Sequence, residues 1–220
     1  MVFSIFKNII KSVLPASLWL NLRLFRETNI NRKVAKDYIK QMLNDKSPIT
    51  TQMDQHIIGA CDVFEYKSIL EVGSGGGRLS YWYLFNRKDF SGIEPDIWYR
   101  KLVNNFFYDM GFGKHRIQDG DIHNIQFDDN VFDIVTSNAV IEHIQDPVKA
   151  VNELFRVARR GCVITFPYGH EADSPDHIQH FYEKDVEELF SSYNYESSIV
   201  YDRPDGNRCY LVIIKKLGSV

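Results

Sequence analysis

The sequence has few cysteines, no long apolar run and no excess of basic residues, and each shortage excludes a class of protein. Its three cysteines among 220 residues lack Cys-x-x-Cys spacing, which argues against a disulfide framework or a zinc-cysteine site. No apolar stretch approaches the roughly 20 residues of a membrane-spanning helix. The net charge of -3 is unlike that of broad nucleic-acid binders. We therefore expect a globular protein that does not act on nucleic acid.

The start of the chain does not resemble a secretory signal peptide. No basic region precedes its apolar part, and no clear small-residue cleavage site follows. Together with the scattered cysteines, this predicts a cytoplasmic protein.

Residues 1–66 are expected to form a helical extension, separate from a domain at residues 67–220. Residues 1–14 place apolar side chains on one helical face, and Pro15 is expected to end this helix and begin the next. Residues 1–26 contain basic but no acidic side chains. Two roles stay open: the extension caps a binding cleft, or residues 1–26 lie on the inner face of an anionic membrane.

From residue 67 onward, short β-rich runs alternate with helical patterns. The β-rich runs are residues 68–72, 90–93, 132–136 and 162–166, and the helical stretches between them are 79–85, 98–110 and 148–157. This alternation predicts an α/β fold with a doubly wound, mostly parallel sheet. A helix at residues 183–190 and further β-rich runs at 196–201 and 208–214 predict an antiparallel hairpin at the end of the sheet.

The segment Glu71-Val-Gly-Ser-Gly-Gly-Gly77 follows the first expected strand and opens a helix. Its glycines permit a sharp turn and let a ligand approach main-chain amides at a helix N-terminus. The spacing departs from the dinucleotide pattern G-x-G-x-x-G, because Arg78 stands where the last glycine is expected. Glu71 would repel a pyrophosphate but attract a ligand that carries an ammonium and a sulfonium group. The segment therefore favours S-adenosylmethionine over NAD.

In several motifs that occur in order, residues 67–190 resemble the class I S-adenosylmethionine-dependent methyltransferases, in particular the small-molecule branch that includes the quinone-biosynthesis enzymes. The resemblance implies a seven-stranded Rossmann-like sheet and S-adenosylmethionine as cofactor. It assigns the ribose hydroxyls to Glu94 and the adenine to Asp121 and Ile122. Residues 132–144 are similar to the fourth strand and following motif of this branch. The cofactor-binding residues expected are Glu71, Gly73, Ser74, Gly75, Gly77, Glu94, Asp121, Ile122 and Asn138.

Methyl transfer to a hydroxyl needs a positioned nucleophile and a base. An imidazole, with an ordinary pKa of about 6.5, can take this proton near neutral pH. His143 is the first candidate for the catalytic residue, and His177 is the second. The loop after the fifth strand could also bind a divalent metal, but no recognised ligand spacing is present, so none is expected. The residues of this loop that could act as ligands are His170, Glu171, Asp173, Asp176, His177 and His180.

The acceptor is expected to be a small molecule, most simply a hydroxyl of a sugar, a lipid-linked intermediate or a quinone precursor. A protein acceptor would usually require an added recognition domain, and none is visible in the sequence. Two alternatives stay open: a catalytically silent relative that acts as a binding partner, and an NAD-linked oxidoreductase. The glycine spacing and Glu71 disfavour the second.

Overall fold

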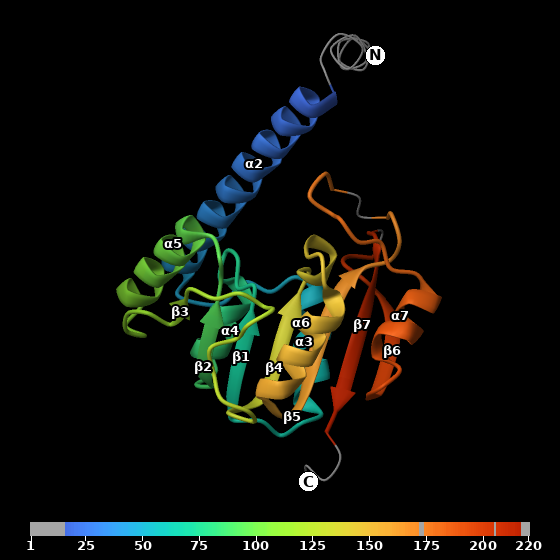
Figure 1. Ribbon diagram of the computed structural model, residues 1–220. Helices are drawn as coiled ribbons and strands as arrows, with labels where there is room; N and C mark the ends of the chain where they lie inside the picture. The colour runs from blue at the N-terminus through green and yellow to red at the C-terminus, as the bar shows by residue number, and fades with distance from the viewer. Residues whose placement is uncertain (1–15, 172–173, 205, 217–220) are drawn as a thin grey trace.

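The computed structural model describes residues 16–171, 174–204 and 206–216, with side chains from residue 28 onward. A seven-stranded sheet runs through the molecule in the order β3-β2-β1-β4-β5-β7-β6 (Figure 1). β1 to β5 are parallel, whereas β7 is antiparallel to both of its neighbours. The strands are β1 (Ser68–Val72), β2 (Asp89–Ile93), β3 (Ile117–Gln118), β4 (Phe132–Asn138), β5 (Ala158–Pro167), β6 (Asn194–Tyr201) and β7 (Arg208–Lys215).

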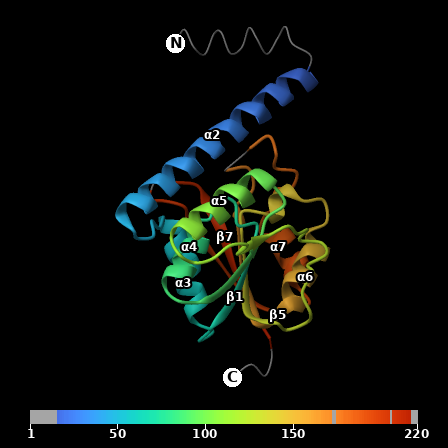
Figure 2. The same cartoon turned by 90° about the vertical axis from the view of Figure 1, so that its left-hand side faces the viewer.

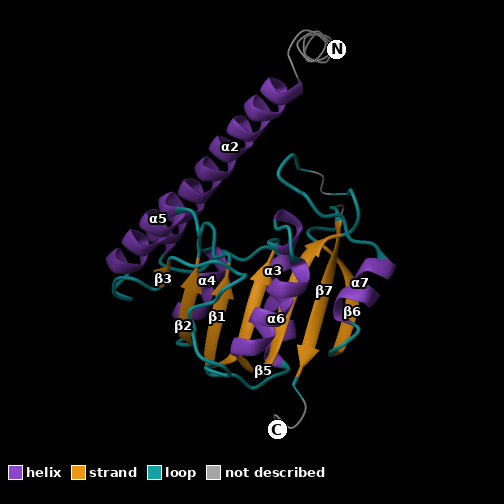
Figure 3. Ribbon diagram, viewed as in Figure 1, coloured by secondary structure: helices purple, strands orange, loops and turns teal. Residues whose placement is uncertain are grey.

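Helices cover both faces of this sheet (Figure 3). The predicted α/β, doubly wound fold with its antiparallel C-terminal hairpin is confirmed. Three described elements were not separately predicted: the two-residue β3, the helix α3 and the short 3-10 turn after β4. The helices are α2 (Ala16–Asp45), α3 (Gln52–Asp62), α4 (Arg78–Phe85), α5 (Ile97–Asp109), the 3-10 turn η1 (Ile141–His143), α6 (Pro147–Val157) and α7 (Glu183–Phe190).

The central strands form because apolar and β-branched residues dominate them, which suits a sheet buried on both faces. In β4, every residue from Phe132 to Ser137 is buried. Two hydrophobic clusters separate along the two faces. One contains Leu154 of α6 and Phe190 of α7, and the other contains Ile57 of α3 and Phe107 of α5. The division at residue 66 stays a prediction, although α3 shares a core with the sheet.

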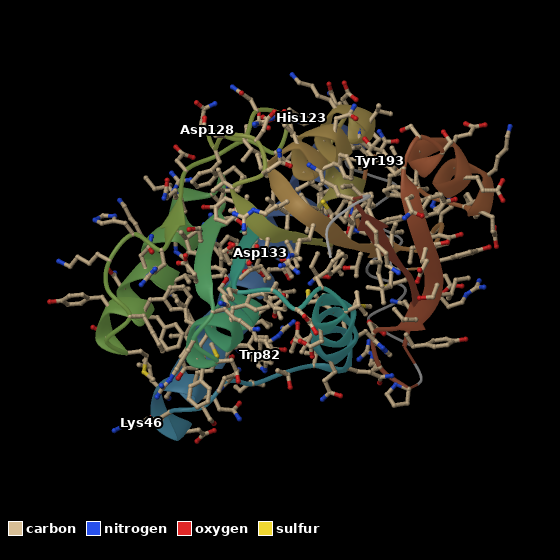
Figure 4. The ribbon with its side chains drawn as sticks, turned by 90° about the horizontal axis from the view of Figure 1, so that it is seen from below. Lys46, Trp82, His123, Asp128, Asp133 and Tyr193 are labelled. Carbon is tan, nitrogen blue, oxygen red and sulfur yellow. The ribbon has the colours of Figure 1, made fainter. Side chains whose placement is uncertain are left out.

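A buried carboxylate joins the amino ends of three central strands, opposite their carboxyl ends. Asp133 accepts hydrogen bonds from the backbone N–H of Lys67 and of Ser68, at 2.8 and 3.0 Å. Arg159 donates to its other oxygen at 2.7 Å. Asp133 lies near the centre of the view from below in Figure 4. These contacts connect β1, β4 and β5 at their amino ends and involve no residue at the carboxyl ends of the strands.

The helix α2 is longer than the sequence indicated, since it continues from Ala16 to Asp45. Its C-terminal part lies beside α5, and its N-terminal part extends away from the sheet (Figures 1 and 2). The helix expected at residues 1–14 and the break at Pro15 lie outside the described residues. Within the described parts of the chain, none of the helices combines the length and apolar character needed to cross a membrane.

Candidate functional site

A cavity of about 1230 Å³ opens at the carboxyl ends of the parallel strands. This is where ligands bind in open α/β sheets, at the point where the strand order reverses. All nine residues that the sequence predicted for the cofactor line this cavity, as does His143. His177 does not line it, but its ring meets that of His143, as described below.

The glycine loop between β1 and α4 forms the floor of the cavity. The N–H groups of Gly73 and Ser74 donate to the carbonyl of Ile93 at 2.9 and 3.2 Å, which holds the loop against β2. Gly75 has a φ of +46°, and a Cβ there would have no neighbour within 4 Å. A side chain at this position would therefore project into open cavity rather than into protein. The backbone at Gly75 is left accessible to a ligand.

Glu94 follows β2 directly and also lines the cavity. It is only 8% exposed. One oxygen of its carboxylate accepts from the N–H of Gly75 and the other from the N–H of Asp96, both at 2.9 Å. Burial raises the pKa of this carboxyl, and these two backbone donors oppose the rise. The carboxylate predicted to bind ribose hydroxyls thus already fixes the glycine loop.

Glu71 ends in the same cavity and is 4% exposed. Burial raises the pKa of its carboxyl to about 8, despite the hydrogen bond that Ser80 donates to it. A carboxyl in this state is largely protonated at neutral pH and gains a charge when a cation arrives beside it. Glu71 is therefore a buried carboxyl whose ionisation a positively charged ligand would favour.

An ion pair that sequence reasoning did not predict lies beside the glycine loop. Asp54 of α3 is completely buried, and Arg78 donates to its two oxygens at 2.6 and 2.9 Å. The guanidinium of Arg78 also lies over the ring of Tyr38 from α2, at 5.2 Å. All three residues line the cavity.

The helix α2 approaches the glycine loop closely enough to serve as a wall of the cavity. A Cβ at Gly76 would stand 3.0 Å from the Cβ of Ala35. Arg32 forms an ion pair with Asp96 at 3.1 Å, which anchors α2 to the start of α5. The segment that covers the cavity is therefore residues 31–38 of α2.

The remaining predicted cofactor residues lie after β3 and β4. Ile122 is buried, whereas the side chain of Asp121 is 67% exposed and binds the ring of His123 at 2.9 Å. The hydrogen bonds from His123 lower the pKa of Asp121. The side-chain oxygen of Asn138 accepts a hydrogen bond from Thr165.

The two predicted catalytic histidines meet at one end of the cavity. The rings of His143 and His177 lie 4.8 Å apart, edge to face. Nδ1 of His143 is 3.1 Å from the carbonyl oxygen of Asp176. Beneath them, Glu142 is 1% exposed, and its burial raises the pKa of its carboxyl to about 8.

The other loop histidines lie elsewhere. The ring of His170 packs against that of His180, 3.7 Å away, and Glu171 is paired with Arg208. Asp173 lies outside the described residues. Among the described residues, the loop does not bring its candidate ligands together as a set; only Asp176 and His177 lie beside His143.

Sequence reasoning missed Tyr38, Asp54 and the burial of Glu142. One signal was available: Thr51 and Asp54 form a capping box at the start of α3, and this pattern can be read from a sequence. The pairing of Asp54 with Arg78 joins positions 24 residues apart, which no local pattern indicates.

Comparison with known proteins gives one domain family. Residues 70–166 match the model of a methyltransferase domain. An uncharacterised methyltransferase of Schizosaccharomyces pombe is 50% identical over 42% of this chain and 36% of its own length. The chain thus matches only about a third of that relative.

Solved structures share the fold at low sequence identity. The protein YcgJ of Bacillus subtilis superposes with a TM-score of 0.60 and 16% identity, over 74% of this chain and 100% of that one. A SAM-dependent methyltransferase from Aquifex aeolicus has a TM-score of 0.55 and 18% identity, over 72% of this chain and 88% of that one.

Proposed function

Residues 70–166 are a methyltransferase domain of the class I S-adenosylmethionine-dependent family, and from that premise we propose that the protein methylates a small-molecule acceptor. The observation that carries the proposal is the acidic glycine-loop cavity. Glu71 and Glu94 are both buried at its wall, and the backbone of Gly75 faces open space.

The chemistry of these residues suits S-adenosylmethionine. Glu71 would compensate a positive charge on the methionine part, and Glu94 can accept hydrogen bonds from hydroxyl groups. Asp121 and Ile122 would hold the adenine. A pyrophosphate fits less well, because it would bring negative charge beside two buried carboxyls. When bound, the cofactor supplies a methyl group on a sulfonium.

The acceptor end of the cavity is the end at His143. We place the acceptor hydroxyl there and assign His143 as the group that takes its proton, with His177 beside it. His143 lines the cavity, and its Nδ1 contacts the loop after β5. Its ring can therefore accept the proton of a hydroxyl bound in the cavity. The acceptor classes that suit this role are a sugar, a lipid-linked intermediate and a quinone-like hydroxyl.

The proposal is tested by titrating the full chain with S-adenosylmethionine, S-adenosylhomocysteine and NAD in a calorimeter. We expect binding of the first two at one site and none of the third. Binding of NAD alone would replace the proposal by an oxidoreductase. Binding of the first two without any methylated product, across a broad set of hydroxyl acceptors, would favour a catalytically silent relative.

Replacing Glu94 by alanine is expected to weaken S-adenosylmethionine binding by about 1–3 kcal/mol, the usual effect of losing a hydrogen bond to a charged group. The variant loses the contact to Gly75 as well as the hydroxyl acceptor. Calorimetry with the cofactor and its 2′-deoxy and 3′-deoxy analogues measures both effects. If the variant still distinguishes the analogues as the parent does, Glu94 does not bind the ribose.

Binding of S-adenosylmethionine at pH 7 is expected to release a proton from Glu71. The pKa of this carboxyl is about 8 in the folded protein, so it is protonated at pH 7, and an adjacent cation favours the charged form. Affinity should therefore rise as the pH increases toward 8. Binding heats in buffers of different ionisation enthalpy measure the proton released.

Two variants locate this proton. Glu71→Gln should abolish the release, whereas Glu142→Gln, which removes the other buried carboxyl with a pKa near 8, should keep it. Proton uptake by the parent, or release by both variants, would contradict the role of Glu71.

The helix α2 supports a further proposal, that the protein associates with an anionic membrane surface. Its described part exposes Lys33, Lys36 and Lys40 together with Ile30 and Val34. Each basic residue near an anionic surface contributes about 1 kcal/mol of attraction. Because Val34 also lines the cavity, this surface would bring a lipid-linked acceptor to the site.

Sedimentation with anionic vesicles is expected to retain the full chain at low salt and release it at high salt. A chain that starts at Glu27 should bind more weakly, and a full chain with Lys33, Lys36 and Lys40 replaced by glutamine should do so too. If no form binds and truncation only lowers the stability of the fold, the extension acts as a cap alone.

A further inference from the structure

Three side chains with metal-binding atoms gather beside the acceptor end of the cavity, and of the three His143 lines it. Glu142 and His143 come from η1, directly after β4, and His177 comes from the loop after β5. One carboxylate oxygen and one nitrogen from each ring all lie within 4.8 Å of one another. The set has two nitrogen donors and one oxygen donor.

Backbone hydrogen bonds hold these elements together. The N–H groups of Ile178 and Gln179 donate to the carbonyl of Glu142 at 2.8 and 3.0 Å. The N–H of His177 donates to the carbonyl of Ser174 at 3.0 Å. The loop after β5 is thus fixed on η1 by main-chain contacts, so the three side chains converge without depending on one another.

Glu142 supplies an independent sign of a missing partner. Both of its carboxylate oxygens are buried, and neither has a hydrogen-bond partner among the described residues. Nε2 of His143 lies 3.9 Å from the carboxylate, which is beyond a hydrogen bond. A buried carboxyl without any partner is costly. A cation at this point would supply what the protein does not.

We propose that Glu142, His143 and His177 bind one divalent transition-metal cation and leave coordination positions open toward the cavity. Two imidazoles and one carboxylate suit zinc, cobalt, manganese or iron better than magnesium or calcium. Three protein ligands with an open position are typical of catalytic metal sites. Tetrahedral bonds of about 2.1 Å place ligand atoms about 3.4 Å apart, so the atoms of this cluster, which lie up to 4.8 Å apart, would have to move closer on binding.

The site departs from the expectation that the loop after β5 binds no metal, and of the candidate ligands in that loop it uses only His177. The role of the cation rests on the proposed function. An acceptor hydroxyl bound at the open position would have a lower pKa, because the cation stabilises the alkoxide. Its proton would pass to water. A C–O bond then forms to the methyl group, while the C–S bond breaks and leaves its electron pair on sulfur. With the cation bound, His143 would serve as a ligand, so this inference keeps the proposed methyl transfer but replaces the assignment of His143 as the base.

The test uses the full chain without an affinity tag, stripped of metal by a chelator. Calorimetric titration with Zn²⁺ and visible absorption with Co²⁺ should each give one site per chain. Glu142→Gln and His177→Gln should each weaken binding by about 10–100-fold or more. His170→Gln removes a histidine of the same loop outside the cluster and should bind as the parent does.

The inference is overturned if the parent binds neither metal, or if both ligand variants bind as tightly as the parent. Urea unfolding of each variant shows whether it is folded. If Glu142→Gln does not fold, His177→Gln alone tests the site. Titration with S-adenosylmethionine is independent of the metal. Cofactor binding without metal binding rejects only this inference, and metal binding without cofactor binding rejects only the proposed function.

Discussion

Gly75→Val is expected to weaken S-adenosylmethionine binding by about 100-fold, or roughly 2.8 kcal/mol, while the protein stays folded. The valine side chain would project into the cavity, since no protein atom lies within 4 Å of a Cβ at this position. It would therefore occupy space where a ligand meets the backbone of the glycine loop. Calorimetry measures the change in affinity.

The control for this variant must separate ligand exclusion from backbone strain. Gly113 also has a positive φ, +87°, and open space around its Cβ, but it lies outside the cavity lining. Gly113→Val should carry a similar strain, on the order of 1–2 kcal/mol of folding stability, without a change in cofactor affinity. Equal affinities for Gly75→Val and the parent would reject the position of the cofactor.

Arg78→Met is expected to lower the free energy of unfolding by about 3–5 kcal/mol, the usual effect of removing one partner of a buried ion pair. Asp54 is completely buried, and 23% of the Arg78 side chain is exposed. Among the described residues, the variant would leave the carboxylate of Asp54 with the N–H of Thr51 as its one remaining donor. Urea unfolding measures the loss.

Two further variants test the cause of this loss. Asp54→Asn combined with Arg78→Met removes the buried charge and keeps an acceptor for Thr51, so it should recover more than half of the stability. Lys184→Met breaks the exposed pair with Glu188 and should cost only about 0.3–0.5 kcal/mol. A loss below about 1 kcal/mol for Arg78→Met would mean that water reaches Asp54.

The sheet and the glycine loop could be predicted because their signals are local. The runs at residues 68–72 and 132–136 are mostly apolar or β-branched, and the glycines between Gly73 and Gly77 predict a sharp turn. β3 was missed because two residues, Ile117 and Gln118, are too few for a period to show. The length of α2 was missed because its helical pattern after Arg26 is interrupted by polar residues.

The candidate site could be predicted only in part, since burial and pairing depend on tertiary contacts. Glu71 could be located from its place near the end of β1, and Glu94 from its place directly after β2. In contrast, nothing around Glu142 in the sequence indicates that its carboxyl lies 1% exposed. The wall that α2 contributes depends on the small side chain of Ala35 meeting Gly76, two positions 41 residues apart in the chain.

The position of β7 has a consequence for the synthesis of the protein on the ribosome. Among the described strands, β7 is the last in sequence, yet it lies between β5 and β6, and β6 pairs with β7 alone. While residues 208–215 are still in the exit tunnel, β6 lacks its neighbour β7. The side of β5 that later pairs with β7 is then an open edge. Domains generally fold as units during translation. The complete sheet of this domain can therefore form only after residues 208–215 have left the tunnel.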